Sequence, residues 1–123
     1  MPEGWGPSGG NTALDAANAA HRWVQLHTGS PGAAGTADVA ANSTRKQATD
    51  TSAAGGASTT TGDLTWSALE VTTDETYTHY TRWSASTAGG FGYSGAITAG
   101  EATAGQPFTL PASDLDSSVP LAS

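Results

Sequence analysis

Cysteine is absent from this sequence of 123 residues, which excludes disulfide bridges and metal sites built on thiolates. Basic residues are scarce: four lysines and arginines stand against eleven aspartates and glutamates, and the formal net charge is −7. This charge opposes binding to nucleic-acid phosphates and to an anionic membrane surface, so we expect neither partner. The sequence also lacks an apolar run of the roughly 20 residues that span a bilayer, and it lacks the basic and apolar regions of an export signal. We therefore expect a soluble chain that is not exported.

Large apolar side chains are also few, because many of the hydrophobic residues, which make up 37% of the sequence, are alanines. The aromatic residues and a small supply of Leu, Val and Ile must fill the one core for which a chain of this length has room. The 16 glycines raise the entropy cost of ordering the backbone. An isolated monomer is expected to be marginally stable, so we expect neighbouring copies or other proteins to support it.

Turn signals divide the sequence into several short strands, which predicts a mainly β protein: a small antiparallel β-sandwich with one short N-terminal helix and an extended N-terminal arm. Residues 1–22 are assigned to the arm and helix, and residues 23–123 to the sandwich domain. The clearest strand covers residues 76–85, where β-branched and aromatic side chains dominate. Further strands are expected at 23–28, 44–50, 64–69, 91–98, 106–111 and 114–121. Alternation in strand 76–85 predicts one face with Tyr77, His79, Thr81 and Trp83, and the other with Thr78, Tyr80 and Arg82.

The helix is expected at residues 12–22, because this alanine-rich segment begins with residues that cap helices well. Asn11 or Thr12 is the expected N-cap, which places Asp15 in the first turn, where a negative charge suits the helix dipole. The first ten residues contain four glycines and two prolines, and we expect them to form an extended arm. Trp5 is its one large side chain, so it is the expected anchor on a neighbouring subunit.

The sequence contains no convincing arrangement for catalysis or for metal binding, so we expect no enzyme activity, no metal and no cofactor. Ser94 lies in the segment Gly92-Tyr93-Ser94-Gly95, whose glycines do not have the spacing of a Gly-x-Ser-x-Gly nucleophile elbow. His21, His27 and His79 are too far apart in sequence to converge locally on a metal. We interpret His79 as a strand residue with a partly buried, hydrogen-bonded ring.

Four tryptophans and three tyrosines in a small β protein would also suit a surface that stacks on sugar rings. Because other large apolar residues are few, most of these aromatics are needed for the core, and we assign Trp66 and Trp83 to it. Trp5, Trp23 and Tyr93 remain as the candidate interface residues.

Five segments in one order resemble a group of small bacteriophage virion structural proteins, described as tail-fibre-like, minor tail or capsid-associated proteins. The segments are LHTGSPGAAGT at 26–36, THYTRWSA at 78–85, the glycine pair at 89–90, SGAIT at 94–98 and AGQPFTLPASDL at 104–115. The resemblance spans roughly residues 23–115. Ser30 and Ser84 stand where the pattern usually has an acidic residue.

The resemblance implies a virion structural protein without enzyme activity, and it does not fix the place in the particle. The acidic charge favours the outer surface of the virion, and the small core favours a homo-oligomer. We expect the protein to be made in the host cytoplasm. Our main hypothesis is a decoration or minor capsid protein on the outer face of the phage head, bound to the major capsid protein. The alternative is a minor tail or tail-fibre-like protein that contacts tail subunits and binds a receptor or carbohydrate. A free carbohydrate-binding module is a third hypothesis.

Overall fold

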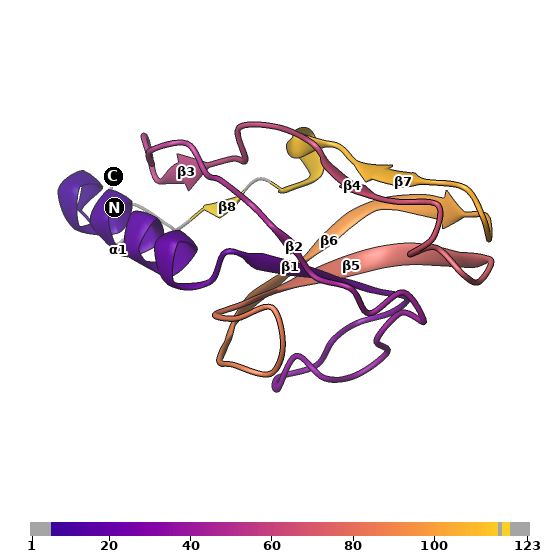
Figure 1. The fold of residues 1–123 in the computed structure, drawn as a ribbon. Coiled ribbons are helices and arrows are strands. Elements are labelled where there is room, and N and C mark those ends of the chain that lie inside the picture. Colours follow the sequence, from indigo (N-terminus) through magenta and orange to yellow (C-terminus); the bar gives the residue numbers. More distant parts are fainter. Residues whose placement is uncertain (1–5, 116, 119–123) are drawn as a thin grey trace.

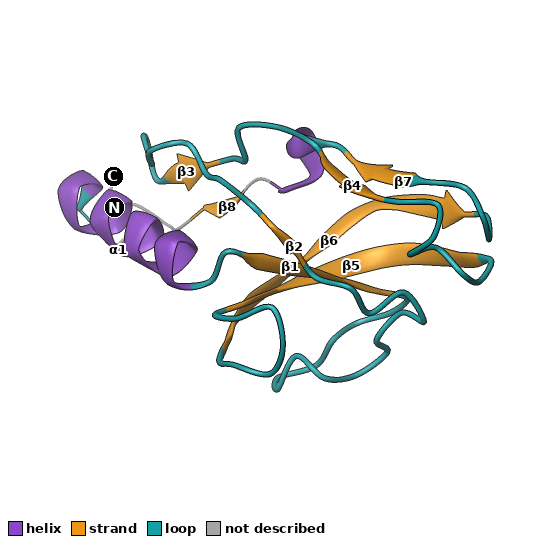
Figure 2. Ribbon diagram, in the orientation of Figure 1, coloured by secondary structure: helices purple, strands orange, loops and turns teal. Residues whose placement is uncertain are grey.

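The computed structural model describes residues 6–115 and 117–118, and it is mainly β with antiparallel sheets, as predicted. The central sheet has the strand order β2-β1-β5-β6, formed by Lys46–Gln47, Trp23–His27, Glu75–Trp83 and Phe91–Ala102. A second layer crosses over this sheet (Figures 1 and 2) and contains two antiparallel pairs. These pairs are β4 (Leu64–Trp66) with β7 (Phe108–Leu110), and β3 (Ala57–Ser58) with β8 (Ser117–Ser118). The described part of the chain has one α-helix, α1 (Pro7–Ala20), and one 3₁₀ helix, η1 (Ala112–Leu115).

The core lies between the two layers, and Trp66 is at its centre with no exposed surface. Its indole N–H donates to the backbone oxygen of Thr44 at 2.7 Å, so burial leaves no polar atom of the ring unpaired. The ring of Phe108 lies 6.1 Å from that of Trp66 and meets Tyr77 edge-on at 4.7 Å. The assignment of Trp66 to the core is therefore confirmed. Aliphatic residues from both layers complete the cluster: Val24, Leu26, Leu64, Val71, Ile97, Leu110 and Leu115.

Strand β5 follows the predicted alternation over its second half. Tyr80 and Arg82 face the second layer and α1, whereas Trp83 is buried on the opposite face of the sheet, as predicted. The predicted position of Tyr77 on the Trp83 face is wrong, because Tyr77 lies in the core cluster with Tyr80. The pairing of β5 with β6 shifts register between Tyr77 and His79, and such an irregularity moves a side chain to the other face of a sheet.

Helix α1 begins five residues earlier than predicted. Pro7 occupies the first turn, Gly6 is the N-cap residue, and no side chain caps the helix. Proline suits this position because its missing N–H would have no helical partner there and its fixed φ matches the helix. The predictions that residues 7–10 are extended and that Asp15 lies in the first turn are therefore wrong. Residues 1–5, and with them the expected anchor Trp5, lie outside the described residues.

The other strand predictions differ from the structure mainly in length. The polar segment 44–50 contributes only the two residues of β2, and 64–69 only the three of β4. Strand β6 extends to Ala102, four residues beyond its predicted end. The expected strand at 114–121 is replaced at its start by η1, and β8 follows at 117–118. Strand β3 lies in a segment rich in glycine, serine and threonine, where no strand was predicted.

The face of the central sheet opposite the core is covered by the loop that joins β1 to β2. His27, fully buried, links this loop to the sheet: its Nδ1 lies 2.8 Å from the oxygen of Ala37, and its Nε2 lies 2.8 Å from the hydroxyl of Thr81. That hydroxyl also accepts the indole N–H of Trp83 at 2.7 Å. A carbonyl accepts only, so Nδ1 carries the proton and the Thr81 hydroxyl donates to Nε2. With a neutral imidazole, every donor in this hydrogen-bond chain has an acceptor.

Acid is expected to destabilise the fold through His27. Burial lowers the pKa of His27 below its ordinary value of 6.5, and the hydrogen bond to Ala37 offsets this only in part. The unfolded chain therefore binds the proton more readily, so the contribution to stability is complete above that ordinary value and is lost as the pH falls through it towards the folded pKa. The thermal midpoint is expected to decrease as the pH is lowered from about 7.5 to about 5.5, and to decrease less in a His27→Gln variant. Equal falls in both proteins would assign the acid sensitivity to another group.

Candidate functional site

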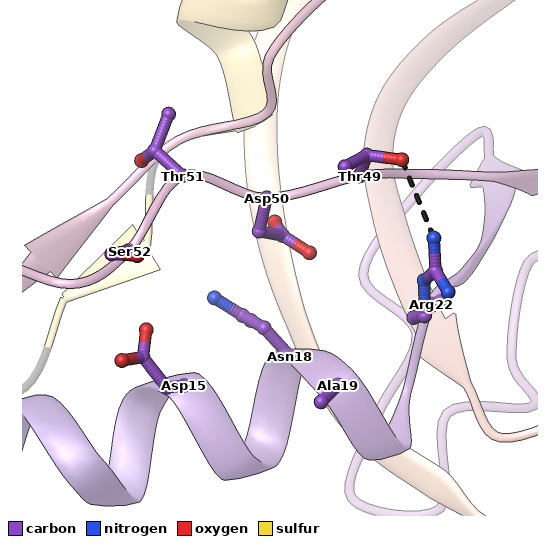
Figure 3. A pocket seen from close by; sticks show the side chains of 8 residues that line it. All are labelled: Asp15, Asn18, Ala19, Arg22, Thr49, Asp50, Thr51 and Ser52. Atoms are coloured by element: carbon purple, nitrogen blue, oxygen red, sulfur yellow. Dashed lines mark hydrogen bonds between the residues drawn. The ribbon is translucent and has the colours of Figure 1, made fainter.

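A groove lies between α1 and the segment 49–52, and it encloses a cavity of about 250 Å³. Figure 3 shows the side chains that line it, with Asp15 and Asn18 rising from the helix and Asp50 facing them from the opposite wall. Arg22 closes one end, donating from Nη2 to the hydroxyl of Thr49 at 3.3 Å. The remaining lining residues are Ala19, Thr51 and Ser52. The groove is therefore polar and contains groups of both charges.

Arg82 lies beneath this groove and is completely buried. Its guanidinium donates two hydrogen bonds to Asp50, from Nη1 at 2.7 Å and from Nη2 at 2.6 Å, which is the bidentate geometry of a strong ion pair. Its Nε donates to the oxygen of His21 at the end of α1, at 2.7 Å. Strand β5, the segment after β2 and the helix are thus joined at a single side chain.

Tyr93 of strand β6 completes this buried network. Its hydroxyl accepts from Nη1 of Arg82 at 3.1 Å and donates to the side-chain oxygen of Asn18. Burial opposes the charged form of Arg82, but the hydrogen bonds and attraction from Asp50 and Tyr93 outweigh it and raise the pKa of Arg82 above its ordinary value. The guanidinium is therefore a permanent buried cation, and its role is to hold the helix against the sheet.

Two polar side chains, spaced four residues apart on α1, fasten the helix to the segment that leads into β3. Asp15 Oδ1 accepts the backbone N–H of Ala53 at 2.7 Å, and Asn11 Oδ1 accepts that of Gly56 at 3.0 Å. Sequence reasoning assigned both residues to the start of the helix and missed this contact. The i, i+4 spacing on one helix face was the available signal, because residues so spaced point in the same direction.

The groove does not have the arrangement of a hydrolytic site. Both carboxylate oxygens of Asp50 accept hydrogen bonds from Arg82. Nδ1 of His21 lies 2.9 Å from the backbone oxygen of Ala17, one turn earlier in the helix. Among the described residues, no group of three His, Cys, Asp or Glu side chains is placed to hold a metal ion. No helix in the described part of the chain is long and apolar enough to cross a membrane. What the groove offers chemically is hydrogen bonding and charge.

The candidate interface residues have different surroundings. Trp23 is half-buried at the start of β1, directly opposite Trp83 of β5 and Gln47 of β2. Tyr93 is also half-buried, but its hydroxyl and ring contact Arg82 and Asn18 inside the molecule. The structure therefore does not bring Trp23 and Tyr93 together into one surface site.

His79 has the environment expected from the sequence. Its ring is half-buried, and its Nδ1 lies 2.8 Å from the hydroxyl of Thr78. We interpret it as a structural residue of the strand.

Comparison of the sequence with known protein families gives a match over most of the chain. A family model described as podophage GP4 fiber I protein gp80 matches residues 10–118. The chain belongs to this family. No curated protein matches the sequence. Membership of the gp80 family supports a structural component of a phage virion. Because the family is described as a fibre protein, the match favours the tail-fibre alternative over our main hypothesis of head decoration.

Proposed function

We propose that this protein is a non-enzymatic, repeated structural subunit of a podophage tail fibre. The observation that carries the proposal is the match of the gp80 fibre family to nearly the whole chain, from residue 10 to residue 118. Tail subunits are then its partners, together with further copies of itself, and its location is the outer surface of the virion.

The organisation of the fold supports a structural role. Its largest polar cluster joins the helix to the sheet and is formed by Arg82, Asp50, Asn18 and Tyr93. The described aromatic rings pack mainly on one another inside the molecule. Such a fold keeps a fixed shape and leaves the contacts between subunits to its surface.

Labelling of intact particles tests the location. An antibody fragment against the purified protein, linked to gold, is expected to bind at the tail and not across the head when particles are imaged by electron microscopy. Particles of an unrelated phage serve as the control for non-specific binding. Label distributed over the head would reject the fibre assignment and restore the decoration hypothesis.

A further inference from the structure

Two basic side chains near one end of the central sheet form no ion pair among the residues that the structure describes. Arg82 is paired with Asp50, and Lys46 is paired with Glu70 at 2.7 Å. Arg22 and Arg45, the other two basic residues of the sequence, form no ion pair with any residue that the structure describes. In a protein of net charge −7, these two guanidinium groups are an exception.

These two arginines lie on opposite faces of the sheet. Arg22 closes the α1 groove, where it donates to Ala48 and Thr49, whereas Arg45 lies on the face of Trp23. The guanidinium carbon of Arg45 lies 4.3 Å from the ring centre of Trp83, the residue directly opposite Trp23 on β5. Gln47, exposed, lies directly opposite Trp23 on β2. We call Trp23, Arg45 and Gln47 the Trp23 patch.

The indole of Trp23 also distinguishes this patch. Trp66 and Trp83 each donate the indole N–H to a neighbour inside the fold, whereas that of Trp23 donates to no described residue. A half-buried ring with an open N–H, next to arginine, has the composition of a protein interface centre, where tryptophan and arginine contribute most to binding.

The opposite end of the same sheet is acidic. A cavity of about 300 Å³ is lined by the carboxylates of Asp74, Glu75 and Glu101, with Thr76, Ala102 and Thr103. Glu75 uses both oxygens, and Asp74 one, to accept backbone N–H groups. Glu101 is exposed and has no described hydrogen bond or ion pair. We call Asp74, Glu75 and Glu101 the acidic pocket.

The patch and the pocket cannot meet within one molecule. Glu75 and Trp83 are the first and last residues of β5, and eight steps of a strand separate their ends by about 27 Å. Figure 1 shows the turn after β5 and the loop after β6 at opposite ends of the sheet. Charge of opposite sign at the two ends is therefore complementary only between different molecules.

We propose that the Trp23 patch of one copy binds the acidic pocket of the next copy. The proposal rests on the proposed function as a repeated subunit, because it names the surface through which copies join. A guanidinium has the planar set of donors that carboxylates accept, and the half-buried indole supplies apolar area beside it. Since the two surfaces differ, copies add in one direction, forming a ring if the rotation closes and a filament if it does not.

Two charge reversals test this contact in the purified full-length protein. Arg45→Glu places acid against acid, and Glu101→Lys places base against base, so each variant alone is expected to assemble about tenfold or more weakly than the wild type. In an equal mixture of the two variants, every patch meets a pocket of opposite charge, and assembly is expected to return. Sedimentation velocity over a concentration series measures all three cases.

Thr12→Lys and Glu101→Gln are the matched controls, because each changes the net charge by one unit but only the second alters the pocket. Assembly is expected to weaken in Glu101→Gln and to stay unchanged in Thr12→Lys. Gln47→Glu, at an exposed position of the patch, repeats the test if Arg45→Glu, which loses hydrogen bonds to Ala85 and Ala88, melts early.

A wild-type protein that stays monomeric throughout the concentration series would overturn the proposal, as would a mixture that assembles no better than its components. If these variants assembled normally but no longer bound sugar, the proposal would also be rejected. The ligand of the Trp23 patch would then be a glycan. These outcomes are independent of where the label lies on particles, so failure of the contact and failure of the fibre assignment are distinguishable.

Discussion

Replacement of Asp50 by alanine is expected to lower the free energy of unfolding by about 3 to 5 kcal/mol. Removing the carboxylate leaves the guanidinium of Arg82 buried without its counter-ion, and desolvation of an unpaired charge is much more costly than loss of the pair itself. Urea unfolding followed by tryptophan fluorescence measures the change. This loss would be most of the stability of a small domain.

The double variant Asp50→Ala with Arg82→Met is the informative control. It removes the charge together with its partner, and methionine fills much of the space, so it is expected to regain a large part of the stability lost in Asp50→Ala. Asp63→Ala is a matched single change, because Asp63 accepts one backbone N–H from Ala112 at an exposed site. Its loss is expected to be about 1 kcal/mol. Equal losses in Asp50→Ala and Asp63→Ala would show that Arg82 does not depend on its ion pair.

Truncation of Trp83 to alanine is expected to cost about 3 to 5 kcal/mol as well, for a different reason. The ring is 7% exposed, and it packs against Phe91 at 5.4 Å and beneath the guanidinium of Arg45. Its removal leaves a cavity under the loop that joins β1 to β2 and takes away the donor to Thr81. Thermal unfolding measures the loss.

Trp23→Ala is the control for Trp83→Ala, because Trp23 is half-buried and donates no described hydrogen bond. We expect it to unfold much closer to the wild type, while assembly of copies is reduced. If Trp83→Ala melted within a few degrees of the wild type, Trp83 would not be the support of this face of the sheet.

Strand positions were predictable where the sequence carries strong local signals. The segments 23–28 and 76–85 combine β-branched or aromatic residues with adjoining turns, and the structure has β1 and β5 there. Strand β3 was not predicted, whereas β8 lies inside the strand that was expected at 114–121. The residues of β3 are small and carry no local strand signal, so its pairing depends on the rest of the fold.

The start of α1 was predicted wrongly because helix propensity argues against a helix in the glycine-rich segment where it begins. Glycine is a poor helix former, so Gly9 and Gly10 argued for an extended arm. In the structure Gly10 is buried, and its N–H donates to the oxygen of Gly6 at 2.8 Å. Tertiary packing outweighs a propensity difference of about 1 kcal/mol per glycine.

The α1 groove shows the same limit for a site. Arg82, Asp50 and Tyr93 are distant in sequence, and nothing in their spacing indicates a shared hydrogen-bond network. Tyr93 was predicted as an interface residue because the core was expected to take most of the other aromatic side chains. The pairing of Arg82 with Tyr93 across β5 and β6 placed the tyrosine beside the guanidinium instead.

The sequence by itself determined the class of the fold, the burial of Trp66 and Trp83, and the resemblance to phage structural proteins. These depend on composition and on short-range order, which are properties of the chain before it folds. Only the tertiary structure decided that Tyr77 joins the core, that Arg82 anchors the helix, and that Arg45 and Glu101, which form no ion pair with any described residue, lie at opposite ends of one sheet. Strand register and the contacts between distant segments set these features, because each requires residues that are far apart in sequence to meet at fixed positions.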